Sequence, residues 1–202
     1  MPRKTRIILT DYPHHVVQRG NNKSKLFREI KDSETYLRFL KEYAQEESID
    51  IVSYCLMPNH IHLLAIPRVD GSLQKMMHRL NISFAQYINK KYGRSGALYE
   101  GRYFCALVNN ERYLWAVCRY IELNPVRAGM VGNPTHYVWS SARFHMNKIN
   151  FDPVVEKPVW EYYTDKTSYQ TFLSSSDRTS NDDDLMITLS TFRNESIGNH
   201  AL

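Results

Sequence analysis

The chain has 202 residues, enough for one domain of ordinary size with an extension, and its 43% hydrophobic content is enough for a buried core. It has no apolar run near the about 20 residues that span a bilayer, and its first residues lack the hydrophobic stretch of a signal peptide. Residues 1–144 carry a net charge of +9 and residues 145–202 a net charge of −4, so we expect no membrane protein but a basic body suited to nucleic acid.

The first half of the chain predicts three strands and one helix. A strand over 14–19 ends at the turn-forming Gly20-Asn21-Asn22. A helix begins at Asp32 or Ser33 and keeps apolar residues at helical spacing to about Glu47. Strands over 49–56 and 60–66 then form a hairpin around the turn at 57–59.

The second half adds a long amphipathic helix from 71–72 to about 92, a strand over 102–108 and a helix from 111 to about 124. The order β-α-β-β-α-β-α predicts an α+β, ferredoxin-like split β-α-β fold, an antiparallel sheet with helices packed on one face. We expect one domain over residues 1–145 and an acidic C-terminal extension over 146–202, partly ordered or made of short helices.

The three cysteines, Cys55, Cys105 and Cys118, each stand alone in an apolar segment, without the spacing of a disulfide frame or a zinc knuckle. Reduced, buried thiols are therefore expected, which favours a cytoplasmic protein.

His60 and His62 are the most informative pair of residues. Because strand side chains alternate, both imidazoles project from one face, while Ile61, Leu63 and Ala65 project from the other. Two neighbouring neutral imidazoles form half a site for a divalent metal ion. Alternatively, they are two half-buried histidines that are hydrogen-bonded to the backbone.

Tyr120 and Asn124 lie one turn apart on the last predicted helix, and so on the same helix face. A tyrosine hydroxyl is a competent nucleophile for phosphoryl transfer, and an amide oxygen is a suitable third ligand for a divalent ion. Alternatively, Tyr120 is an ordinary packed aromatic residue, and Asn124 caps a further helix that begins at Pro125.

These motifs resemble those of the single-tyrosine HUH transposases, most closely the REP-associated tyrosine transposase branch. The resemblance covers about residues 8–145 and rests above all on two segments at a specific spacing, Met57–His62 and Tyr120–Gly129. It includes three further segments, His15–Asn21, Gly101–Tyr103 and Tyr137–Ser141. Asn124 stands where related insertion-sequence enzymes tend to have glutamine.

The resemblance implies an enzyme that cleaves and rejoins single-stranded DNA at hairpin-forming repetitive palindromes. Tyr120 would form a 5′-phosphotyrosine, with His60, His62 and Asn124 holding Mg²⁺ or Mn²⁺. It also favours a monomer over a homodimer and places the protein in the cytoplasm, associated with the nucleoid. No general base for the tyrosine is apparent in the sequence.

Basic residues around these motifs are candidates for phosphate contacts, and nearby tyrosines could stack on unpaired bases. The candidates for DNA binding are Arg3, Lys4, Arg6, Arg19, Lys23 and Arg102.

Two other readings remain open. One is a binding module of the same fold that marks palindromes without cutting them. The other is an unrelated metal hydrolase in which His60 and His62 bind zinc with a distant carboxylate.

Overall fold

The computed structural model describes residues 6–109 and 111–162, together with residues 171, 173, 187 and 190. Its main elements are β1 (His14–Arg19), α1 (Ile30–Glu46), β2 (Ile49–Met57), β3 (His60–Pro67), α2 (Ser72–Lys91), β4 (Phe104–Leu107), α3 (Glu111–Arg127) and the short α4 (Ala142–His145). Three 3-10 turns, η1 (Asn21–Lys23), η2 (Pro134–His136) and η3 (Val159–Tyr162), lie between or after them. Among the described residues, no helix is long and apolar enough to cross a membrane.

The four strands form one sheet in the order β2-β3-β1-β4, and every neighbouring pair is antiparallel. The two central strands, β1 and β3, are not consecutive strands in the chain, as the split β-α-β arrangement requires. In this register Val17 lies opposite His62, and Arg19 lies opposite His60. The predicted fold class is therefore confirmed.

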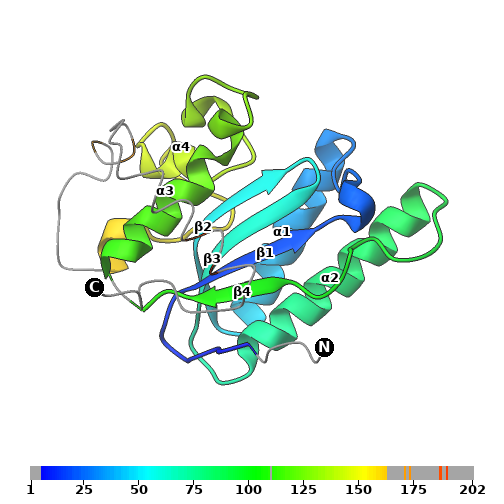
Figure 1. Ribbon diagram of the computed structural model, residues 1–202, viewed down its shortest axis with the longest axis horizontal. Coiled ribbons are helices and arrows are strands. Elements are labelled where there is room, and N and C mark those ends of the chain that lie inside the picture. Colours follow the sequence, from blue (N-terminus) through cyan, green and yellow to red (C-terminus); the bar gives the residue numbers. More distant parts are fainter. Residues whose placement is uncertain are drawn as a thin grey trace.

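Helices cover both faces of the sheet, so the expectation of helices on one face is wrong for α3. Ile61 and Leu63 of β3 pack into a core with α1 and α2, whereas Leu64 and Ile66 pack into a second core with α3. Figure 1 shows α3 apart from α1 and α2. The reason is that β2 and β3 are apolar on both faces, and each face needs a cover.

Two helices extend beyond their predicted limits. α1 begins at Ile30 because Glu29 and Asp32 form a reciprocal capping box, in which the Asp32 carboxylate accepts from the Glu29 backbone N–H at 3.2 Å. α3 continues through Pro125 to Arg127, so Asn124 does not cap a new helix there. β4 is shorter than expected and leaves Arg102 in a bend before the strand.

The described part of the C-terminal extension packs against the body. Asp152 accepts hydrogen bonds from the backbone N–H groups of Val154 and Val155 and from the hydroxyl of Tyr54. Val155 belongs to the core under α1, and Val159 to the core under α3. Most of the extension beyond residue 162 lies outside the described residues. The three cysteines are buried thiols outside any disulfide bond, as expected.

Candidate active site

Three histidines gather on the face of the sheet that α3 covers. His60 and His62 project together from β3, with ring centroids 4.8 Å apart, as the alternation of strand side chains predicts. His15 of β1 lies diagonally across from His62, and their rings stack at a centroid distance of 5.3 Å. The contact of His15 with His62 was not expected from the sequence, because it depends on the register between two strands far apart in the chain.

The turn before β3 orients His60. The Nδ1 atom of His60 lies 2.7 Å from Oδ1 of Asn59. An amide oxygen only accepts, so Nδ1 carries the proton and Nε2 keeps its lone pair. Burial, and to a smaller extent the positive charge of Arg19, lowers the pKa of His60 to about 4. The ring is therefore neutral at physiological pH and able to bind a cation.

His62 is more deeply buried. Its Nδ1 lies 3.1 Å from Nε2 of His15. Burial holds the pKa of His62 well below its usual value, with smaller contributions from His15, His60, Arg19 and Arg127. Its Nε2 is buried without a hydrogen-bond partner among the described residues. A buried polar atom without a partner is costly, and a bound cation would satisfy it.

Tyr120 of α3 lies directly against this histidine cluster. The edge of its ring meets the His62 ring at a centroid distance of 5.6 Å and the His15 ring at 5.7 Å. The guanidinium of Arg127 lies 5.1 Å from the centre of the Tyr120 ring. The structure therefore brings together the predicted nucleophile and the predicted histidine pair, from positions about sixty residues apart.

Asn124 is oriented by its own helix. Pro125 has no N–H to give to the carbonyl of Ile121, which an uninterrupted helix would provide. The Asn124 amide instead donates to the carbonyls of Tyr120 and Ile121, at 2.8 and 3.4 Å. These bonds occupy Nδ2, so Oδ1 is the atom that Asn124 can offer to a cation.

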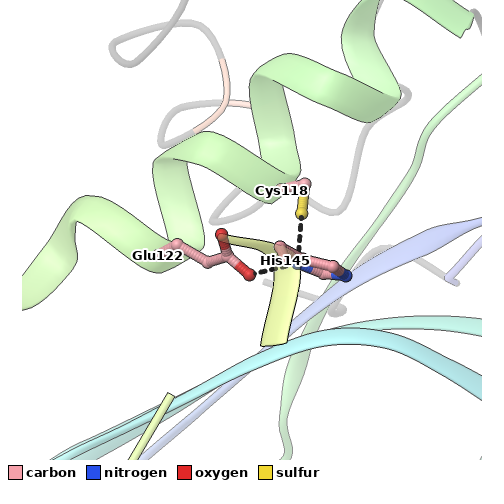
Figure 2. Close-up of side chains that lie close together, drawn as sticks. All are labelled: Cys118, Glu122 and His145. Carbon is pink, nitrogen blue, oxygen red and sulfur yellow. Dashed lines mark hydrogen bonds and ion pairs between the residues drawn. The ribbon is translucent and has the colours of Figure 1, made fainter. Parts of the chain in front are cut away.

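A buried polar cluster lies on the neighbouring side of α3. Figure 2 shows Cys118 and Glu122 of α3 directed towards His145 of α4. Their ligand atoms lie within 4.8 Å of one another, a spacing that a metal ion could bridge. All three side chains are buried. The cluster was not expected from the sequence, because His145 falls at the edge of the predicted domain.

Hydrogen bonds already occupy the atoms of this cluster. One Glu122 oxygen accepts from the Ser141 hydroxyl at 2.6 Å and lies 2.5 Å from Nδ1 of His145. The Nε2 atom of His145 accepts the backbone N–H of Val159 at 3.3 Å. Because both ring nitrogens have partners, we interpret the cluster as a polar anchor that fixes α3 to the segments around it.

The predicted DNA-binding residues differ in their surroundings. Arg19 lies at the end of β1 next to His60, while Lys23 and Arg102 are exposed. Arg6 is engaged with the protein itself: it donates to the carbonyl of Tyr103 at 2.6 and 3.1 Å, and its guanidinium lies 3.8 Å from the centre of that ring. The remaining two candidates, Arg3 and Lys4, lie outside the described residues.

Known proteins resemble this chain in sequence and in fold. The family model described as "Transposase IS200 like" matches residues 9–124. The structure of a REP-associated tyrosine transposase bound to a REP hairpin has the same fold, with a TM-score of 0.61 and 16% identity, over 83% of this chain and 96% of that one. A candidate transposase of Deinococcus radiodurans R1 aligns with a TM-score of 0.42 and 14% identity, over 55% of this chain and 89% of its own. No curated protein matches the sequence.

Proposed function

The chain belongs to the IS200-like transposase family, whose model matches more than half of it, and from this premise we propose that it cleaves and rejoins single-stranded DNA at hairpin-forming palindromes. Family membership makes the protein a DNA transposase. The finer assignment of a hairpin substrate is supported by the fold shared with a transposase bound to a REP hairpin. The exposed Lys23 and Arg102 and the basic body supply charge for phosphate contacts.

In the proposed reaction the hydroxyl of Tyr120 attacks the phosphorus of the scissile phosphodiester. A bond forms between the tyrosine oxygen and phosphorus, and the bond from phosphorus to the 3′ oxygen breaks. The tyrosine loses its proton, and the 3′ oxygen gains one, which gives a 5′-phosphotyrosine and a free 3′-OH. The tyrosyl ester conserves the energy of the phosphodiester, so the strand can be rejoined without ATP.

The side chains around Tyr120 support this role. His60 and His62, both neutral, would hold Mg²⁺ or Mn²⁺ through Nε2, with Oδ1 of Asn124 as the third ligand. When bound, the metal ion polarises the phosphate and stabilises the leaving oxygen. Arg127 beside the tyrosine ring adds positive charge where negative charge develops.

One observation carries the proposal: the ring of Tyr120 lies against that of His62 at 5.6 Å. A packed aromatic residue could lie anywhere on α3, but this tyrosine lies beside the one histidine of the pair whose Nε2 is buried without a partner among the described residues. The proposed nucleophile and a proposed metal ligand are thus neighbours, which supports a role in covalent phosphoryl transfer.

The experiment is to incubate the full chain with a labelled single-stranded hairpin and Mn²⁺ and to look for a protein–DNA band that survives denaturation. We expect a band with the wild-type protein and none with Tyr120→Phe or with the double change His60→Ala/His62→Ala. Tyr113→Phe, on the same helix, is the matched control and should keep the band. A band with Tyr120→Phe would refute the nucleophile, and hairpin binding without any band would favour a module that binds but does not cut.

We extend the catalytic domain to residue 145, beyond the family match, because Ser141 and His145 hold the helix that carries Tyr120. We also expect the protein to act as a monomer, which sedimentation of the protein with and without hairpin DNA would test.

A further inference from the structure

His15 lies between the two halves of the proposed active site. It is fully buried on the central strand β1, with its Nε2 3.1 Å from Nδ1 of His62. Its ring stacks on that of His62 with an interplanar angle of 11°, and it meets the edge of Tyr120 at 5.7 Å. One side chain therefore contacts both the proposed metal ligand and the proposed nucleophile.

The hydrogen bond between the two rings constrains where the proton of His62 sits. One hydrogen bond joins the two ring nitrogens, so a single proton lies between Nε2 of His15 and Nδ1 of His62. If His15 donated it, His62 would carry its own proton on Nε2 and could not bind a cation there. If His62 donates it, Nε2 of His62 carries no proton, and its lone pair can bind a cation.

The surroundings favour the second arrangement. Nε2 of His62 is buried and has no acceptor for a proton among the described residues. His60 already has the matching arrangement, since Asn59 accepts from its Nδ1. Ligating histidines generally donate their second ring N–H to a fixed acceptor, which sets the tautomer and the ring orientation.

We propose that His15 is a positioning residue which accepts the Nδ1–H of His62 and so presents the Nε2 lone pair of His62 to a divalent metal ion. This inference rests on the proposed function, because it assumes that His62 is a metal ligand. The acceptor is unusual in being a neutral imidazole instead of a carboxylate. His15 also keeps the nucleophile at a fixed spacing from the ligand, since its ring packs against Tyr120.

The test is Mn²⁺ binding to the full chain without DNA, measured by calorimetry. His15→Phe keeps a ring of similar size but removes the acceptor, and we expect it to weaken Mn²⁺ binding by about 10- to 100-fold. His15→Gln restores an acceptor oxygen and should recover part of the affinity. His14→Phe is the matched control: His14 is the neighbouring buried histidine, and it accepts the backbone N–H of Leu9 instead. It should bind Mn²⁺ like the wild type.

A second measurement needs no variant. Nitrogen NMR of the histidine rings in the wild-type protein should report a protonated Nδ1 and a bare Nε2 for His62. The opposite tautomer, or wild-type Mn²⁺ affinity in a folded His15→Phe protein, would overturn the inference. A different result would refute the proposed metal site itself: the double variant His60→Ala/His62→Ala would bind Mn²⁺ as well as the wild type does.

Discussion

Arg127 lies over the ring of Tyr120 and also donates a hydrogen bond to the backbone of Tyr120. Its guanidinium carbon is 5.1 Å from the ring centre, and Nη1 donates to the Tyr120 carbonyl at 2.8 Å. The two residues are seven positions apart, two turns along a helix that Pro125 does not end. The cation is thus carried on the same helix as the proposed nucleophile.

We predict that Arg127→Ala slows formation of the protein–DNA adduct by about tenfold, equivalent to about 1.4 kcal/mol of barrier. The reason is the loss of a positive charge beside the oxygen and phosphate on which negative charge develops. Arg127→Lys keeps the charge and should be less impaired. Because Arg127 is exposed, stability should change by less than about 1 kcal/mol. Single-turnover kinetics with the labelled hairpin give the rate, and an unchanged rate in Arg127→Ala would contradict the role.

In the polar anchor of α3, formed by Cys118, Glu122 and His145, substitutions should lower the stability of the protein by unequal amounts. Glu122→Ala leaves the His145 N–H buried without its carboxylate acceptor and removes the shortest hydrogen bond of the Ser141 hydroxyl, and should lower the free energy of unfolding by about 3–5 kcal/mol. Cys118→Ala removes only a weak partner and should cost about 1 kcal/mol. Urea denaturation measures both. Stoichiometric zinc in the purified protein, lost in Cys118→Ala, would show instead that the cluster is a metal site.

Acid should destabilise the protein through its buried histidines. Burial lowers the pKa of His14 and His60 to about 4 and that of His15 to about 3, from 6.5. The unfolded chain therefore binds more protons than the folded one below pH 6.5. The histidine contribution to stability is complete above that pH and is lost as the pH falls towards 4. Thermal melting of the metal-free protein between pH 8 and pH 4 measures this, and a melting temperature unchanged from pH 6.5 to pH 4.5 would contradict it.

Charge on the exposed basic residues should govern hairpin affinity. Lys23→Ala and Arg102→Ala each remove one phosphate contact, so each should reduce the slope of log affinity against log salt by about 0.7–0.9. The control is Arg38→Ala, since Arg38 lies on α1, on the opposite face from α3, and pairs with Glu42. Filter binding over a salt series in EDTA measures the slopes. Equal slopes in all three variants would place the DNA elsewhere.

Gly20 should be required for the turn that orients His60. A Cβ atom at this position would lie 2.3 Å from the backbone oxygen of Ser24, and the Gly20 N–H donates to the Asn59 carbonyl at 2.9 Å. We expect Gly20→Ala to cost about 1–3 kcal/mol of stability and to weaken Mn²⁺ binding. Gly132→Ala, with nothing within 4 Å of the added atom, is the control. Wild-type stability and Mn²⁺ affinity in Gly20→Ala would disprove the requirement.

The sequence was most informative where structure depends on neighbours along the chain. The alternation around His60 and His62 predicted their strand and their common face, and the one-turn spacing of Tyr120 and Asn124 predicted their common helix face. The side of the sheet that α3 covers, and the contact of His15 with His62, depend on strand pairing between distant segments. The anchor at His145 depends likewise on where the chain returns after α3, which no local pattern specifies.

The histidines and Tyr120 are held in place by different parts of the structure, and this difference affects how the protein could evolve. The histidines belong to a sheet held by backbone hydrogen bonds and by cores on both faces, whereas the helix of Tyr120 is held in part by one carboxylate and its partners. A substitution at Glu122 could displace the tyrosine and leave the sheet and the basic surface in place. If the proposed function holds, a descendant that had lost strand cleavage in this way would still bind hairpins and compete with its active relatives for the same DNA sites.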